Sequence, residues 1–152
     1  MLNKIIKFIT TFGFIGYMPL APGSMASIAG GLLAVYISSN LAVYLSVFTV
    51  VTVLGFLASG RMEAIVGAKD PSCVVIDEVS GIMIAFFLLP QTASVLVTAF
   101  FLFRAFDMFK IYPADKFESV KGGGGIMMDD IVAGIYTNLT MHLALRLISW
   151  VR

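Results

Sequence analysis

The sequence contains few charged residues. Only 12% of its 152 residues are Asp, Glu, Lys or Arg, whereas a soluble globular domain usually carries about 25%. The mean hydropathy is +0.98, so a lipid bilayer rather than water is expected to surround much of the chain. The net charge of +1 provides no strongly basic surface of the kind that binds nucleic acid.

Cysteine and histidine are also nearly absent. Cys73 is the single cysteine, which excludes a disulfide within the chain. Zinc prefers cysteine and histidine ligands, and Cys73 and His142 are too few to form such a site. His142 lies deep in the last apolar segment, so we expect it to be packed or hydrogen-bonded rather than to bind a metal.

Long charge-free runs dominate the rest of the sequence. Residues 25–60 and 79–103 contain no charged residue, and turn signals interrupt each run at 38–40 and 89–92. No alternating pattern typical of strands persists. The sequence therefore predicts an all-α fold in one domain, residues 1–152: a compact polytopic membrane bundle of about five apolar helices. Their predicted ranges are 25–38, 41–59, 77–89, 92–110 and 129–150, of which the first and third are short for a span of about 20 residues.

The N-terminal segment has a different pattern. Residues 1–18 predict an amphipathic helix at the membrane surface, with Ile5, Phe8, Ile9 and Phe12 on one apolar stripe. The prolines at 19 and 22 interrupt the apolar stretch, which argues against a signal peptide.

Charge is distributed unequally between the two predicted membrane sides. If the N-terminus is inside and the chain crosses five times, eight of the ten Lys and Arg residues and all nine acids lie on the inner side. Positive residues concentrate on the cytoplasmic side of membrane proteins. We therefore expect an inner-membrane protein with its chemistry on the cytoplasmic face.

Two motifs combine adjacent acids with glycine, VIDEVSG at 75–81 and GGGGIMMDDIVAG at 122–134. Each is predicted to open a helix, where the helix dipole favours a carboxylate, and a glycine one turn later lets another backbone or a ligand approach. The residues are Asp77, Glu78 and Gly81 in the first motif, and Asp129, Asp130 and Gly134 in the second. Taken alone, either pair is also explained as an ordinary helix cap.

A third motif, FRAFDMFK at 103–110, places Arg104, Asp107 and Lys110 three residues apart at the inner end of a predicted helix. Alone, this pattern is a salt-bridged helix end. Together, the three motifs crowd carboxylates from separate helices into one site, and a hard cation would neutralise them, with Mg²⁺ preferred over Mn²⁺ or Ca²⁺. Arg104, Lys110 and the backbone amides of the glycine loop would add a phosphate site. The loop residues concerned are Gly123, Gly124 and Gly125.

Several known phosphate chemistries lack their motifs here. A cysteine phosphatase needs an arginine six residues after Cys73, where Val79 stands. The sequence also has no histidine in a polar loop, no Asp-x-Asp-x-[Thr/Val] motif and no Gly-Lys-[Ser/Thr] loop. The remaining route is attack by a metal-activated water or hydroxide, with a spare carboxylate as general base.

Four motifs together resemble the phosphatidylglycerophosphatase A family: the three above and GFIGYMPLAPGSMAS at 13–27. The resemblance implies a Mg²⁺-dependent membrane enzyme of phospholipid biosynthesis that hydrolyses the terminal phosphate of phosphatidylglycerophosphate to give phosphatidylglycerol. It implies a metal site of Glu78, Asp107, Asp129 and Asp130, with Asp77 beside it among the catalytic residues. It also implies that Arg104 and Lys110 hold the phosphate.

The sequence departs from the family pattern at two positions. Ser24 stands where the family more often has threonine, which retains the hydroxyl group as a candidate substrate contact. Ile111 follows Lys110 where the family usually has proline.

Two other functions stay open at this stage. A membrane cation or proton transporter subunit would carry acids near mid-span, and a metal-stabilised scaffold would release no phosphate. The number of metal ions, the identity of the general base, homo-oligomerisation and activity on related lipids such as phosphatidate also stay open.

Overall fold

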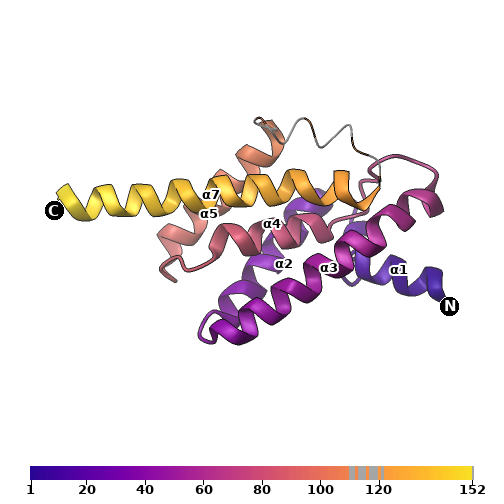
Figure 1. Ribbon diagram of the computed structural model, residues 1–152, viewed down its shortest axis with the longest axis horizontal. Coiled ribbons are helices and arrows are strands. Elements are labelled where there is room, and N and C mark those ends of the chain that lie inside the picture. Colours follow the sequence, from indigo (N-terminus) through magenta and orange to yellow (C-terminus); the bar gives the residue numbers. More distant parts are fainter. Residues whose placement is uncertain (110–111, 113–115, 117–119, 121, 152) are drawn as a thin grey trace.

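The computed structural model describes residues 1–109, 112, 116, 120 and 122–151. Within this part of the chain the secondary structure is helical, with no strand, which confirms the all-α prediction (Figure 1). The elements are α1 (Leu2–Thr10), a short 3₁₀ helix (Ile15–Tyr17), α2 (Pro22–Ile37), α3 (Leu41–Val66), α4 (Ile76–Phe86), α5 (Ala93–Phe109) and α7 (Gly123–Val151).

Two of the described helices, α3 and α7, are long and apolar enough to cross a membrane. Only 17% of the most apolar stretch of α3 and 22% of that of α7 are buried, so their side chains face mainly outward, as lipid-facing helices require. The other predicted spans are shorter, at 16 residues in α2, 11 in α4 and 17 in α5. The structure therefore supports two spanning helices rather than about five.

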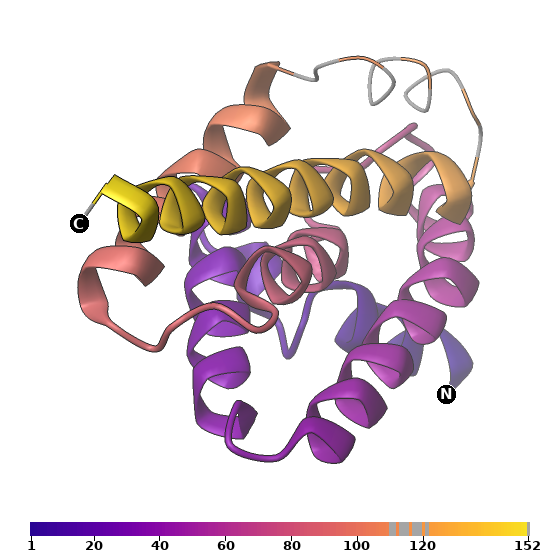
Figure 2. The ribbon, with the colours of Figure 1, turned by 60° about the vertical axis from the view of Figure 1, so that its left-hand side comes forward.

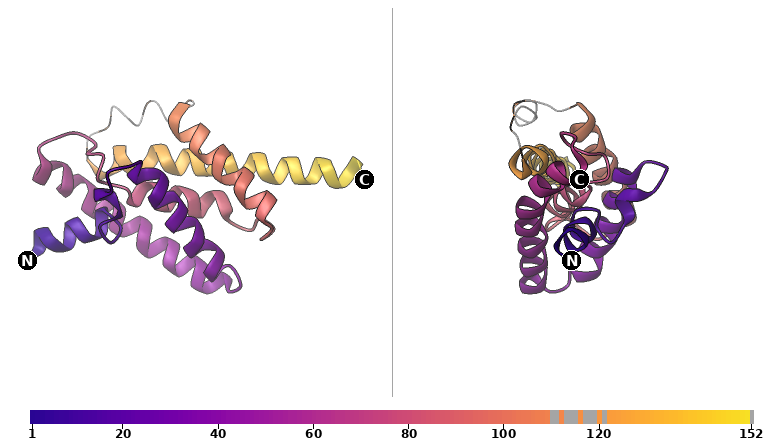
Figure 3. Two further views of the ribbon diagram at one scale, coloured as in Figure 1. Left: turned by 180° about the vertical axis from the view of Figure 1, so that it is seen from behind. Right: turned by 90° about the vertical axis from the view of Figure 1, so that its right-hand side faces the viewer.

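Helix α4 is the centre of the fold, and nine of its eleven residues are buried. It lies between α3 and α7 on one side and α2 and α5 on the other (Figures 1 and 3). Figure 2 shows α4 nearly end-on, surrounded by these helices. Because α4 is enclosed, the residues of its first turn are held in place by four neighbouring helices.

Glycines allow α4 and α7 to approach closely. A Cβ atom on Gly134 would overlap the carbonyl oxygen of Gly81, and one on Gly81 would lie 2.7 Å from the carbonyl oxygen of Asp130. The glycine that follows each acidic pair thus lets another backbone approach, as the sequence predicts. The same contact places the acidic motifs of the two helices side by side.

Helix α7 begins earlier than the sequence predicts. Asp129 and Asp130 do not open the helix, because its first turn is formed by the glycines that start at Gly123. A Cβ atom on Gly123 would overlap the carbonyl oxygen of Phe56 on α3, and one on Gly60 would lie 2.9 Å from the Gly123 amide nitrogen. This close packing overrides the low helix propensity of glycine, so the aspartates lie almost two turns inside the helix.

Helix α3 also extends beyond its predicted end at residue 59, because Met62 is buried and continues the apolar face. It ends at Val66 and is capped by Gly67, which adopts a left-handed conformation with φ +75° and donates its N–H to the Glu63 carbonyl oxygen (2.8 Å). The charged residues Arg61 and Glu63 are therefore helical rather than part of a loop.

Helix α1 is amphipathic, and it also buries one face against the rest of the protein. Ile6 and Thr10 are buried, and Ile6 packs in a cluster with Ala58 and Met62 of α3. Ile5 and Phe8 are about half exposed, since packing against α3 selects the face on which Ile6 lies. The exposed residues stay available for the predicted contact with a membrane surface.

Side chains from α3 and α7 form hydrogen bonds with backbone carbonyl groups at the C-terminal end of α4. The Tyr44 hydroxyl donates to the Met83 carbonyl oxygen, and Asn138 Nδ2 donates to the Phe87 carbonyl oxygen at 2.7 Å. His142 Nε2 lies 3.4 Å from the same Phe87 oxygen, so the expected hydrogen-bonded role of this histidine is confirmed. In an apolar environment such carbonyl groups need a partner within the protein.

Candidate active site

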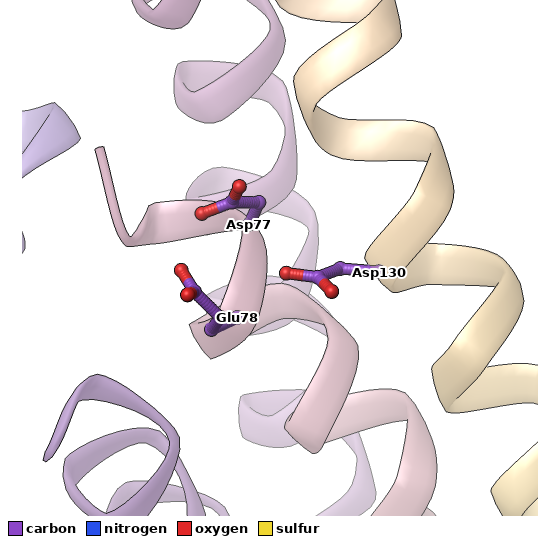
Figure 4. A group of neighbouring side chains, drawn as sticks. All are labelled: Asp77, Glu78 and Asp130. Atoms are coloured by element: carbon purple, nitrogen blue, oxygen red, sulfur yellow. The ribbon is translucent and has the colours of Figure 1, made fainter. Parts of the chain in front are cut away.

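The site is built on the first turn of α4. Asp77 and Glu78 lie in this turn, where the helix dipole stabilises negative charge. Asp130 of α7 faces them across the Gly81–Gly134 contact. One carboxylate oxygen from each of Asp77, Glu78 and Asp130 lies within 4.8 Å of the others, and the three side chains point toward one another (Figure 4).

These carboxylates are largely removed from solvent. Asp77 is 8% and Asp130 3% exposed, and Asp77 Oδ1, Glu78 Oε2 and Asp130 Oδ1 have no hydrogen-bond partner among the described residues. Burial, followed by the charges of Glu78 and Asp130, raises the pKa of Asp77 well above its usual range. Burial also raises the pKa of Glu78. The ionised cluster is therefore costly unless a cation compensates its charge.

The cluster fits a hard divalent ion. Its donors are all carboxylate oxygens from two different helices, which is the ligand type that Mg²⁺, Mn²⁺ and Ca²⁺ prefer. Buried oxygens without a partner are those that a bound cation would satisfy. The chemistry of the donor set thus agrees with the predicted class of hard divalent ions.

Helix α5 adds a cation and a further acid. Arg104 Nη1 lies 2.8 Å from Asp107 Oδ2, an ion pair between residues one turn apart. The Asp107 carboxylate is close enough to Glu78 for its negative charge to act on it. Arg104 is therefore placed beside the acids, where a phosphate group could use its guanidinium. The third member of the motif, Lys110, lies outside the described residues.

A cavity of about 360 Å³ adjoins the cluster. Its wall is contributed by the start of α2, the segment after α3, and α4, α5 and α7. The lining includes every predicted catalytic carboxylate together with Ser24 and Arg104. The full set is Ala21, Pro22, Gly23, Ser24, Asp70, Ser72, Val74, Asp77, Glu78, Arg104, Asp107, Asp129 and Asp130.

The start of α2 contacts the cluster directly through Gly23. A Cβ atom at this position would overlap Glu78 Oε1 and would lie 3.7 Å from Arg104 Nη1. Sequence reasoning missed Gly23, although it lies in a motif that carries the family resemblance. The available signal was Pro22 at the first position of a helix, which places Gly23 in the first turn.

Asp129 occupies a different place from Asp130. Its Oδ1 accepts a hydrogen bond from the Asp130 backbone N–H at 3.1 Å, and it lies on the wall shared with a second cavity of about 240 Å³. The residues lining that cavity are Glu63, Lys69, Asp70, Val120, Gly125, Ile126 and Asp129. The three carboxylates that lie closest together, those of Asp77, Glu78 and Asp130, therefore do not include Asp129 or Asp107. The family resemblance instead implies that Asp77 lies beside the metal ligands and is not one of them.

The three predicted phosphate-binding glycines do not form an open loop. Gly123, Gly124 and Gly125 make the first turn of α7. Gly123 packs against α3, and Gly125 lines the smaller cavity rather than the one with Arg104. Their role in phosphate binding stays a prediction.

Sequence reasoning also missed Asp70 and Ser72, which line the larger cavity. Neither residue belongs to a motif that the sequence singled out.

Comparison with known proteins identifies the family. The family model for phosphatidylglycerophosphatase A matches residues 8–145. Over 142 residues the chain is 36% identical to phosphatidylglycerophosphatase A of Haemophilus influenzae, covering 90% of this chain and 85% of that protein. It is 35% identical over 125 residues to phosphatidylglycerophosphatase A of Escherichia coli, covering 79% and 72%.

A further relative has a different name. The chain is 34% identical over 144 residues, 89% of each protein, to a putative phosphatidylinositol-3-phosphatase of Bacteroides thetaiotaomicron. No solved structure matches the chain. Because the family model covers most of the chain and two relatives are named phosphatidylglycerophosphatase A, the chain belongs to the phosphatidylglycerophosphatase A family and is a phosphatase.

Proposed function

We propose that this phosphatase hydrolyses the terminal phosphate of phosphatidylglycerophosphate in a Mg²⁺-dependent reaction and releases phosphatidylglycerol. The observation that carries the proposal is the group formed by Asp77, Glu78 and Asp130, in which one carboxylate oxygen from each residue lies within 4.8 Å of the others. Asp77 and Asp130 are buried and Glu78 is partly buried, and each of the three has a buried oxygen without a hydrogen-bond partner among the described residues. The family and its phosphatidylglycerophosphatase relatives support the substrate.

In this proposal Asp77, Glu78 and Asp130 hold the ion, and Asp107 and Asp129 stand at the edge of the same cavity. Mg²⁺ held by these residues would offset the negative charge of the carboxylates and would supply Lewis-acid chemistry for the phosphoryl group. Arg104, beside Glu78, binds a phosphate oxygen through its guanidinium. Ser24 offers a hydroxyl group from the start of α2, and we assign Lys110 the same phosphate-binding role as Arg104.

The reaction is hydrolysis of a phosphate monoester. Water attacks phosphorus, and the bond between phosphorus and the glycerol oxygen breaks, so that the phosphoryl group leaves as inorganic phosphate with the oxygen of the water. The proton that the water loses ends on the glycerol oxygen, which becomes the hydroxyl of phosphatidylglycerol. A carboxylate outside the closest group, Asp107 or Asp129, accepts the proton of the attacking water. Both line the cavity in which the phosphate would lie.

The proposal places the protein in the inner membrane as a single multi-pass domain, with its site on the cytoplasmic face. Helices α3 and α7 supply the candidate spans. The connections at 38–40 and 87–92, which lie toward the end opposite the acidic motifs, contain no charged residue (Figure 1). The concentration of Lys and Arg toward the other end favours the cytoplasm there. A diacyl lipid can then present its phosphate while its tails stay in the bilayer.

The test is phosphate release by the purified protein from phosphatidylglycerophosphate, with Mg²⁺ and with EDTA. Phosphatidylinositol 3-phosphate is a second candidate substrate, because one relative is named as a putative phosphatase of that lipid, and phosphatidate completes the panel. We expect fastest release from phosphatidylglycerophosphate, loss of activity in EDTA and recovery with added Mg²⁺. Preference for another lipid would replace the proposed substrate, and activity indifferent to EDTA would contradict the metal-dependent reaction.

A further inference from the structure

Glu63 connects three segments that surround the site. It lies in the last turn of α3, and its Oε1 accepts a hydrogen bond from the Asp70 backbone N–H at 3.0 Å. Its Oε2 accepts a second bond from the Gly122 backbone N–H at 2.9 Å. One carboxylate therefore joins the end of α3 to the connection that follows it and to the start of α7, which is 59 residues away in the sequence.

Both amide donors belong to residues with left-handed backbone. Asp70 has φ +46° and Gly122 has φ +82°. A non-glycine residue in this region is held there by its surroundings, and the bond to Glu63 is a direct restraint on Asp70. Gly122 immediately precedes the first residue of α7, so Glu63 also brings a negative charge to the N-terminal end of that helix.

The two bonded segments carry residues of the site. Asp70, Ser72 and Val74 line the larger cavity from the connection after α3. Helix α7 carries Asp129 and Asp130 about two turns beyond Gly122. Glu63 does not line this cavity itself, and instead lines the smaller one that shares Asp70 and Asp129 with it. It is thus placed to act through other residues rather than on the substrate.

We infer that Glu63 is a positioning residue, which holds the connection after α3 and the start of α7 in the relative position that the acidic site requires. A carboxylate is needed because two N–H groups converge on it and each needs an acceptor oxygen. Glutamine presents one acceptor oxygen and an NH₂ group, which cannot accept the second bond. Aspartate keeps the charge but is one methylene shorter. The inference rests on the proposed function only for its activity readout.

The experiment compares Glu63→Gln and Glu63→Asp with the wild-type protein and with Arg61→Gln as a control. Arg61 is exposed and lies near the same end of α3. Hydrogen–deuterium exchange followed by mass spectrometry should show faster exchange in peptides containing Asp70 and Gly122 for both Glu63 variants, with the rest of the chain unchanged. The Mg²⁺ concentration for half-maximal phosphate release should rise by about tenfold, as for other residues that orient metal ligands. KM for the lipid should change little.

Two results would overturn the inference. One is wild-type exchange in these peptides together with a wild-type Mg²⁺ requirement in both Glu63 variants. The other is a loss of exchange protection spread over the whole chain with an unchanged Mg²⁺ requirement, which would indicate a general contribution to stability. If the wild-type protein releases no phosphate in a Mg²⁺-dependent manner, the proposed function fails, and the exchange measurement still decides the position of the two segments.

Discussion

Gly23 of α2 lies directly against the Glu78 carboxylate of α4, so that a Cβ atom on Gly23 would overlap Glu78 Oε1. The same Cβ atom would lie 3.7 Å from Arg104 Nη1. The absence of a side chain at Gly23 is therefore what allows α2 to close the cavity over the acidic group. This contact links the motif at 13–27 to the motif at 75–81 in space, although some 50 residues separate them in the sequence.

The Gly23→Ala variant should lose activity more than stability. The atom that the new methyl group meets is the end of a flexible side chain, so Glu78 can turn away without displacing the backbone. Moving one of three clustered carboxylates should reduce phosphate release about 10- to 100-fold, with little change in Tm. Initial rates with phosphatidylglycerophosphate and thermal unfolding in detergent measure the two effects.

Gly30→Ala is the matched control on the same helix. A Cβ atom on Gly30 would lie 3.0 Å from the Cα atom of Val79, so the clash involves the backbone of α4. Overpacking of this kind costs about 1–3 kcal/mol. We expect a lower Tm for Gly30→Ala and near-normal activity per folded molecule. A lower Tm with near-normal activity for Gly23→Ala, together with lower activity and an unchanged Tm for Gly30→Ala, would contradict the assignment of Gly23 to the site.

Substitution of the aspartates on α7 should separate their roles. Asp130→Asn removes a member of the closest carboxylate group and should lower activity at least about 100-fold, the upper range for perturbing a metal site. Asp129→Asn should also abolish Mg²⁺-dependent release under standard conditions, but excess Mg²⁺ should restore part of it, because Asp129 lies on the wall between the two cavities. Mg²⁺ titrations of both folded variants check this difference. Wild-type turnover by either variant would show that the site is assigned wrongly.

Asp77→Asn should be inactive yet more stable than wild type when metal is removed. Burial and the neighbouring Glu78 and Asp130 charges raise the pKa of Asp77, so its ionised form destabilises the metal-free fold at neutral pH. An amide of the same size removes that repulsion. Thermal unfolding in EDTA should give a higher Tm for the variant, whereas added Mg²⁺ should raise the Tm of the wild type only. A lower Tm in EDTA would mean that the Asp77 carboxylate stabilises the protein without a cation.

Much of the site could be predicted because its chemistry is local in sequence. Adjacent acids followed by glycine at 77–81 and 129–134 predict both the carboxylates and the close approach of a second backbone. What links Asp130 to Asp77 is the contact between α4 and α7, and no single segment encodes it. The pairing of the acids therefore needed the structure, which brings Asp77 rather than Asp129 into the closest group.

The errors in the fold have a common physical cause. The sequence predicts a glycine-rich loop that includes residues 123–125, in agreement with the low helix propensity of glycine, but in the structure Gly123 lets the start of α7 pack on Phe56 and Gly60 of α3. Local propensity does not report such tertiary contacts. The same limit explains the earlier start of α7 and the missed link through Glu63.

The end of α4 offers a test of stability that is independent of catalysis. Tyr44→Phe removes the hydroxyl group that donates to the Met83 carbonyl oxygen, and Tyr44 is buried, with 5% exposed. Leaving a buried acceptor without its partner costs about 1–3 kcal/mol, so the Tm should fall while turnover per folded molecule is retained. Tyr36→Phe is the control, since Tyr36 is 85% exposed, and it should leave the Tm unchanged. Equal Tm values for the two variants would show that the Tyr44 hydroxyl does not stabilise the end of α4, and a selective loss of turnover in Tyr44→Phe would couple this end of the helix to the distant acidic site.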